Sequence, residues 1–175
     1  MSEPLETEDF FMHLCSLAAK RSNDPVTRVG SVIVNEDNII VGVGHNEMPK
    51  NSNKFSWEKD NPNPLENKGP YVCHAELNAI VNKNAANLKN CRIYVSMFPC
   101  NECAKLIIQL GITEVIYYSD KRANKDYTKA SKRMFRETGV KVRQFSPKNE
   151  KISIDCDEIN GDKSRKRRRP DESDS

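Results

Sequence analysis

The sequence predicts a layered α/β domain, and two patterns carry that prediction. Five apolar segments have the length and composition of strands: 29–34, 39–43, 92–98, 113–118 and 140–145. The first two flank Glu36, Asp37 and Asn38, which is typical of a β-hairpin. The last three alternate with helical patterns, which indicates parallel strands joined by crossover helices. A chain of 175 residues is long enough for one domain with a buried core.

The first half of the chain also supplies a helix and a long loop. Apolar residues recur at helical spacing between Phe10 and Ala18, so we expect a helix over about 8–22. Residues 47–70 are rich in Asn, Pro and Lys and predict an irregular loop. A loop of that length inside a compact domain is usually functional.

Two further helices should begin close to metal-binding side chains. The pattern predicts a helix from Cys73 to about Ala86, which would carry His74 and Glu76. Pro99 ends the strand before the next helix and suits a helical first turn, where its missing N–H has no partner in any case. That helix, over about 100–110, would place Cys100 and Cys103 in its first turn.

The C-terminal part closes the predicted domain. A helix over about 126–137 should end at Gly139, and the alternation of Ile152, Ser153 and Ile154 predicts a short extra strand. From 161 onward the chain is polar and charged, which predicts disorder. We therefore expect a domain over 1–161, with its core at about 8–146, and a tail over 162–175.

Composition narrows the classes of function. No apolar run approaches the roughly 20 residues of a membrane helix, and the N-terminus lacks the basic and apolar regions of a signal peptide. We therefore expect a cytoplasmic protein that does not associate with a membrane. The tail 162–175 holds six basic and four acidic residues, which leaves 22 basic and 21 acidic side chains in residues 1–161. A nucleic-acid-binding domain generally has a basic face, and this balance gives no sign of one.

His74, Cys100 and Cys103 form the motif that decides the function. One imidazole and two thiolates suit zinc, and three protein ligands leave a fourth position open for water, as in catalytic rather than structural sites. Glu76 is close to the ligands without being needed as one, so it can move protons between water and a substrate. The pattern H-x-E with P-C-x-x-C is typical of zinc-dependent nucleobase deaminases.

A structural zinc site is the alternative interpretation of the same residues. It would need a fourth ligand, for which Cys73 and Cys91 are the candidates. Cys73 adjoins His74 and would point elsewhere on a helix, and a structural site gives no reason for Glu76.

For His13 and His45 a packing or surface role is favoured over a role in the site. Trp57, in the long loop, is more simply a packing residue than the wall of a pocket.

Two segments carry a resemblance to the deoxycytidylate (dCMP) deaminase family, within the zinc-dependent cytidine and deoxycytidylate deaminases. They are 71–80 (YVCHAELNAI) and 98–109 (FPCNECAKLIIQ). Val29-Gly30 and Ser119-Asp120-Lys121 also resemble that family, and the similarity spans about 8–157.

The resemblance implies a fold and an activity. The fold is the cytidine-deaminase-like three-layer α/β/α arrangement, a mixed five-stranded sheet with helices on both faces. The activity is hydrolytic deamination of dCMP to dUMP, which supplies dUMP for thymidylate synthesis. His74, Cys100 and Cys103 match the ligands of one catalytic Zn²⁺, and Glu76 matches the proton shuttle. Asn46 matches an asparagine that contacts the deoxyribose, and the backbone at Ala75 a contact to the carbonyl side of the base.

Family members are usually homohexamers that dCTP activates and dTTP inhibits, so the resemblance implies a homo-oligomer and a triphosphate effector that would carry Mg²⁺. Two glycines of the family's effector-binding loop are replaced here by Glu47 and Asn51. Since glycine lets a backbone approach a phosphate closely, we expect weakened control by dCTP.

Two other functional classes remain open from the sequence. One is a deaminase of cytosine or adenine in tRNA or single-stranded DNA, against which the balanced charge of residues 1–161 argues. The other is a zinc-stabilised interaction module, against which Glu76 argues. The basic run Lys163–Arg169 is typical of a nuclear localisation signal, and a solubilising end is the alternative.

Overall fold

A five-stranded mixed sheet forms the centre of the molecule in the computed structural model, which describes residues 4–52, 54–149 and 151–153. Its strands are β1 (Gly30–Val34), β2 (Ile40–His45), β3 (Arg92–Met97), β4 (Glu114–Ser119) and β5 (Lys141–Gln144). They lie in the order β2-β1-β3-β4-β5. Strand β1 pairs antiparallel with β2 and β3, whereas β3, β4 and β5 run parallel to one another. The predicted hairpin and the predicted parallel strands are therefore both present.

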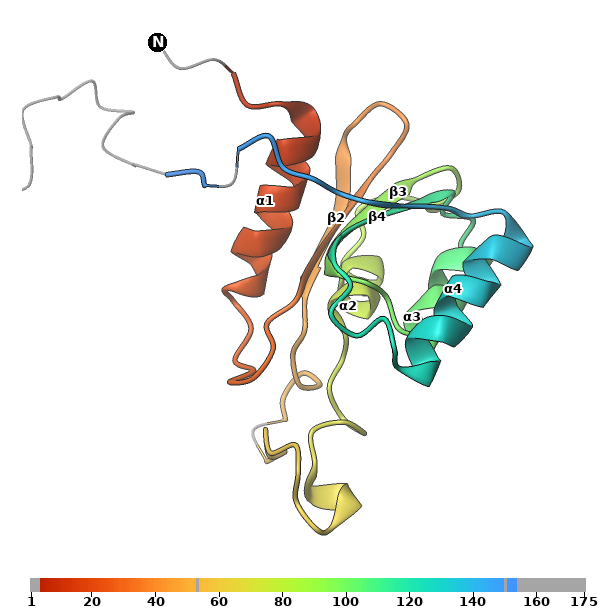
Figure 1. The fold of residues 1–175 in the computed structure, drawn as a ribbon. Helices are drawn as coiled ribbons and strands as arrows, with labels where there is room; N and C mark the ends of the chain where they lie inside the picture. The colour runs from red at the N-terminus through yellow and green to blue at the C-terminus, as the bar shows by residue number, and fades with distance from the viewer. Residues whose placement is uncertain (1–3, 53, 150, 154–175) are drawn as a thin grey trace, which may run out of the picture.

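Helices cover both faces of this sheet (Figure 1). They are α1 (Thr7–Ala19), α2 (Ala75–Val81), α3 (Asn101–Gln109) and α4 (Asp126–Thr138), with a 3₁₀ turn η1 at Pro64–Glu66. Helix α1 packs on one face, where Phe11, Met12 and Cys15 meet Val32 and Tyr94. Helices α2, α3 and α4 pack on the other face. The expected three-layer α/β/α fold is confirmed.

Alternation along the strands produces these two cores. Val32 and Tyr94 point to the α1 side, whereas their neighbours Ile33, Ile93 and Val95 belong to the core under α2, α3 and α4. Successive side chains of a strand point to opposite faces, so a strand with both faces covered reads as one continuous apolar run.

The helix ends differ from the sequence prediction by a few residues. Helix α1 ends at Ala19 rather than near 22, and α2 spans only Ala75–Val81 rather than 73–86. His74 is the N-cap of α2 and Cys100 the N-cap of α3, both in extended backbone, so each precedes its helix. Gly111 and Gly139 have φ of 71° and 73°, the left-handed conformation in which helices commonly end.

The extra strand expected at 152–154 is absent from residues 151–153, and Ile154 lies outside the described residues. The carboxylate of Asp9, in α1, explains the path of the chain at residues 148 and 149. It accepts hydrogen bonds from the backbone N–H groups of Lys148 (3.2 Å) and Asn149 (3.0 Å). These donors bind the first turn of α1 instead of the edge of the sheet. The tail 162–175 also lies outside the described residues.

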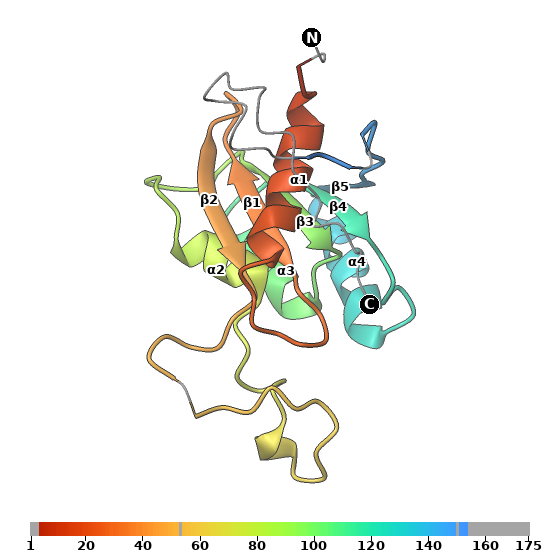
Figure 2. The same ribbon diagram turned by 90° about the vertical axis from the view of Figure 1, so that its left-hand side faces the viewer.

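Residues 47–70 form the irregular connection that the composition predicts. They extend away from the sheet, beyond the end of β2 and the start of α2 (Figures 1 and 2). None of the described helices is long and apolar enough to cross a membrane.

Candidate metal centre and its pocket

His74 is placed by the contact between β2 and α2. Strand β2 ends at His45, whose carbonyl oxygen accepts a hydrogen bond of 2.8 Å from the side-chain amide of Asn78. Gly44 lies against the start of α2, since a Cβ there would be 2.3 Å from the carbonyl oxygen of Ala75. This close approach sets the first turn of α2, and with it His74 and Glu76, at the end of the sheet.

Cys100 and Cys103 come from the junction of β3 and α3. Pro99 ends the strand, Cys100 caps the helix and Cys103 lies in its first turn. Their sulfur atoms lie 3.3 Å and 3.4 Å from Nδ1 of His74. The ligand atoms of the three residues all lie within 4.8 Å of one another, as binding of a single metal ion requires.

Neither Cys73 nor Cys91 belongs to this cluster in the part of the chain that the structure describes. Cys73 forms a backbone bridge with Glu47, and Cys91 is buried just before the opposite end of β3. Neither candidate therefore supplies the fourth ligand of the structural-zinc alternative, and the described residues form a site with three protein ligands.

The chemistry of the cluster suits a soft divalent cation. A hydrogen bond from Cys103, together with one from His74, lowers the pKa of the Cys100 thiol to about 4 despite burial. The pKa of the Cys103 thiol is raised, because the thiol forms a hydrogen bond with Cys100 and is buried. One thiolate is therefore already stabilised, and metal binding releases the remaining protons.

Glu76 is buried beside the cluster, with 4% of its surface exposed. Burial raises the pKa of its carboxyl group above the usual value. A carboxyl with a raised pKa holds and releases a proton closer to neutral pH, which is the property of a general acid–base group.

A pocket opens next to these residues. It is lined by Asp24, Thr27, Val29, Asn46, Lys68, Val72, His74, Ala75, Glu76, Met97, Phe98, Cys100, Arg122 and Tyr127. The predicted residues Asn46, His74, Ala75, Glu76 and Cys100 all border it, and Cys103 lies one turn behind Cys100. His13 and His45 do not line it, in agreement with the roles expected for them.

Asn46 is held in one orientation by the chain around it. Its Oδ1 accepts a hydrogen bond of 2.8 Å from the backbone N–H of Val29. Its Nδ2 donates to Oδ2 of Asp24 at 3.1 Å and to the carbonyl oxygen of Thr27 at 3.0 Å. Both amide hydrogens are engaged, so Asn46 has only the second lone pair of Oδ1 left to offer.

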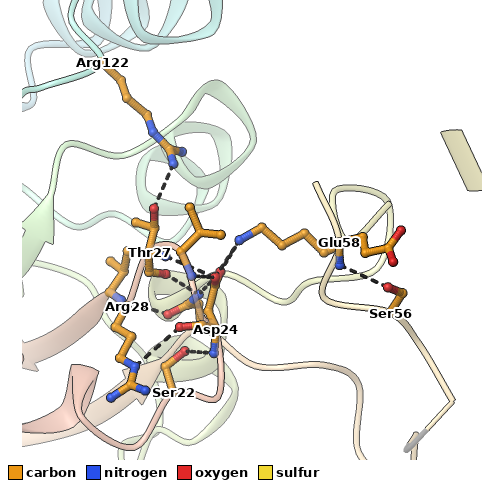
Figure 3. A network of polar contacts seen from close by, with 11 residues as sticks. Ser22, Asp24, Thr27, Arg28, Ser56, Glu58 and Arg122 are labelled. Carbon is orange, nitrogen blue, oxygen red and sulfur yellow. Dashed lines mark hydrogen bonds and ion pairs between the residues drawn. The ribbon is translucent and has the colours of Figure 1, made fainter. Parts of the chain in front are cut away.

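Sequence reasoning missed the polar residues on the far side of the pocket. Asp24 lies at the centre of a network in which Arg122 approaches Thr27 from one side and the loop residues Ser56 and Glu58 lie on another (Figure 3). Lys68 donates to both carboxylate oxygens of Asp24, at 2.6 Å and 2.5 Å. No local motif marks these residues, because they come from separate segments that only the fold brings together.

Known proteins resemble this chain in sequence and in fold. Residues 5–119 match the model of the cytidine and deoxycytidylate deaminase zinc-binding region. The chain is 51% identical over 164 residues to the deoxycytidylate deaminases of Mus musculus and Homo sapiens, covering 93% of this chain and 92% of each relative. A solved structure of the dCMP deaminase of cyanophage S-TIM5, in complex with dCMP and dUMP, matches with a TM-score of 0.66. Its sequence is 25% identical, and the match covers 83% of this chain and 100% of that one.

Proposed function

This chain belongs to the cytidine and deoxycytidylate deaminase family, and we propose that it catalyses the hydrolytic deamination of dCMP to dUMP. The observation that carries the proposal is the His74–Cys100–Cys103 cluster, with buried Glu76 beside it and the pocket in front of it. Relatives at 51% identity bear the name deoxycytidylate deaminase. The product dUMP would serve thymidylate synthesis.

Zinc fits the donor set of the cluster. His74 supplies one nitrogen and Cys100 and Cys103 two sulfurs, a combination that favours Zn²⁺ over the harder cations Mg²⁺ and Ca²⁺. Zinc held by three protein ligands supplies the Lewis acidity that makes a water molecule nucleophilic near neutral pH.

Glu76 carries the protons of the reaction. Water adds to the amine-bearing carbon of cytosine and ammonia leaves, so one proton must reach the ring nitrogen and another the departing amine. Glu76 takes one proton from the attacking water and delivers it to the ring nitrogen, then takes the second proton from the added hydroxyl group and delivers it to the departing amine. Its burial favours this role, because a carboxyl that is easily protonated can return the proton that it has accepted.

Three contacts to the substrate follow from the groups that line the pocket. Ala75 is the first residue of α2, so its N–H has no partner within the helix and can donate to the base carbonyl. Asn46 can only accept, and the 3′-hydroxyl is the donor that the deoxyribose offers. Arg122 is bonded to Thr27 by one hydrogen bond of 3.5 Å, so its guanidinium can bind the 5′-phosphate.

Assembly, regulation and localisation rest on the family resemblance and the sequence alone. The proposal includes a homohexamer, effector binding of dCTP and dTTP with Mg²⁺, and a cytoplasmic protein that the run Lys163–Arg169 directs in part to the nucleus. Light scattering coupled to size-exclusion chromatography tests the first of these.

Substrate comparison tests the activity itself. Zinc-loaded protein is incubated with dCMP, CMP, deoxycytidine or dCTP, and ammonia release is followed. We expect release from dCMP far above that from the other three. Preferential release from CMP or deoxycytidine would contradict the choice of substrate, and none from any of the four would contradict the activity. Single-stranded DNA and a tRNA anticodon stem-loop are included to test the alternative class of deaminase.

A further inference from the structure

Among the described residues 49–52 and 54–70 of the long loop, one side chain forms hydrogen bonds with the body of the protein. Among the described residues, the hydrogen bonds of 49–70 stay within 49–72, except for those of Lys68 with Asp24. The loop extends away from the sheet in both views (Figures 1 and 2). Lys68 is therefore the polar attachment of this segment to the wall of the pocket.

The ion pair between Lys68 and Asp24 is shielded from water. Their side chains are 12% and 3% exposed. Burial by itself would raise the pKa of Asp24, but the hydrogen bonds from Lys68 and from the backbone N–H groups of Thr27 and Val26 hold it below the usual value. The ammonium of Lys68 also lies 6.0 Å from the ring centroid of Trp57, a loop residue, within the range of a cation–π contact.

Asp24 also orients Asn46. Its Oδ2 accepts one of the two amide hydrogens of Asn46, at 3.1 Å, and the same oxygen accepts from Lys68. A carboxylate accepts only, so the amide nitrogen of Asn46 must face Asp24 and its oxygen must face Val29. Lys68 and Asn46, from the two ends of the loop region, thus meet on one carboxylate.

We propose that the Asp24–Lys68 ion pair is a positioning device of the substrate pocket, which holds the Asn46 amide in one orientation and fastens the 47–70 loop beside the pocket. Both residues act through Asn46 and the loop and take no part in the chemistry. This inference rests on the proposed function for its kinetic test, and on the structure alone for its spectroscopic test.

Four variants of the full-length, zinc-loaded protein test the proposal. Lys68→Met removes the charge at nearly constant length, and Lys68→Arg keeps it. The double variant Asp24→Asn with Lys68→Met leaves no unpaired charge, so it remains informative if the single variant folds poorly. Lys59→Met is the matched control, since Lys59 is exposed in the same loop.

The kinetic readout separates positioning from catalysis. We expect Lys68→Met to raise KM for dCMP at least about 10-fold with kcat within about 2-fold, because a binding contact common to the ground and transition states is lost. Lys68→Arg should restore most of the affinity, and Lys59→Met should resemble the unmodified protein. In an Asn46→Ala background the effect of Lys68→Met should shrink, because two residues that act on the same contact are not additive.

Trp57 supplies a readout that does not depend on turnover. It is the only tryptophan in the chain, so its fluorescence reports on the loop alone. We expect Lys68→Met and the double variant to shift its emission and to increase its quenching by acrylamide, whereas Lys59→Met should change neither.

Several results would overturn the proposal. An unchanged KM in folded Lys68→Met, a fall in kcat alone, or full additivity with Asn46→Ala would each remove the positioning role. Unchanged acrylamide quenching of Trp57 in Lys68→Met would contradict the proposal that the ion pair holds the loop beside the pocket. If the unmodified protein fails to deaminate dCMP, the proposed function is wrong, whereas the Trp57 measurement still decides the role of the ion pair.

Discussion

Gly44 and Ala75 are in backbone contact, although 31 positions separate them in the sequence. A Cβ on Gly44 would lie 2.3 Å from the carbonyl oxygen of Ala75 and 2.3 Å from the backbone nitrogen of Ala79. No real Cβ approaches backbone so closely, so β2 and α2 could not pack as they do with any other residue at 44. The position of His74 and Glu76 thus depends on a hydrogen atom in place of a methyl group.

Gly44→Ala should therefore damage the metal centre from outside it. The added methyl group must push α2 away from β2, which we expect to lower the free energy of unfolding by about 1–3 kcal/mol, the usual scale for overpacking. The zinc content of the purified variant should fall with it. Gly69→Ala is the control, because a Cβ at Gly69 meets nothing within 4 Å. Denaturant unfolding and metal analysis are the measurements, and full zinc occupancy in Gly44→Ala would contradict the expected effect.

Substitutions of Glu76 and of the metal-binding cysteines should affect different properties of the protein. Glu76→Gln should retain zinc and the fold but lose at least about 10²-fold in kcat, the scale of a positioned acid–base group. Cys103→Ser should lose the metal and, with it, stability, because metal binding and folding are coupled. Cys73→Ser is the control, since Cys73 lies next to His74 but outside the cluster. Near-normal turnover by zinc-loaded Glu76→Gln would refute the assignment of the proton shuttle.

The stabilisation that Asp24 provides should be lost in acid. Its folded-state pKa lies below the unfolded value of about 3.9, so the stabilisation is fully present above that value and is lost as the pH falls through the folded pKa. The free energy of unfolding of Asp24→Asn should therefore lie below that of the unmodified protein at pH 7. This gap should narrow toward pH 3. Asp60→Asn, at an exposed position of the 47–70 loop, should show no gap at either pH.

Sequence patterns predicted the layers and the residues that the fold gathers in the His74–Cys100–Cys103 cluster because both depend on short spacings. Short apolar runs define the strands, and His74, Glu76 and the pair Cys100 and Cys103 lie within two short motifs. The ends of α2 were wrong because His74 has extended backbone and, after Val81, the backbone N–H of Asn84 donates to the carbonyl oxygen of Val41 in β2, which no local pattern records.

The other wall of the pocket was not predictable in the same way. Asp24 follows α1 in a turn, and Lys68 is one of several lysines in or near a polar loop, so neither differs in local sequence from a solvated surface residue. Their meeting is a tertiary contact over 44 positions, and it exists because β1 and β2 bring Asn46 back beside Asp24.

The tail 162–175 should be dispensable for chemistry. The described residues that form the metal cluster and line the pocket all precede the tail, so its removal should leave kcat and KM for dCMP unchanged. If the run Lys163–Arg169 is a nuclear signal, truncation should shift a fluorescent fusion of the protein toward the cytoplasm. Replacement of the run's basic residues by Gln separates charge from length. Altered kinetics with an unchanged distribution would contradict the targeting role.

Glu47 and Asn51, the two positions at which the family resemblance implies a glycine, differ in backbone conformation. Asn51 has a φ of 63°, the left-handed conformation that glycine favours and that asparagine tolerates better than most residues. Glu47 is not among the described residues with positive φ, and its backbone pairs with Cys73. The backbone at 47 thus does not require glycine, and the replacement acts through its side chain, which is 49% exposed and lies 3.4 Å from Nε2 of His45.

Weak control by dCTP is the expected result of that side chain. The carboxylate of Glu47 adds negative charge where the family resemblance places a triphosphate, and Lys50, three residues on, offsets it only in part. We expect a nearly hyperbolic rate curve against dCMP and little activation by dCTP with Mg²⁺. Glu47→Gly should increase the activation, whereas Asn51→Gly should not, because Asn51 already has the backbone conformation of a glycine. Initial rates at several dCTP and dTTP concentrations are the measurement. Strong activation of the unmodified protein by low dCTP, reversed by dTTP, would show that the loop accepts the effector despite Glu47.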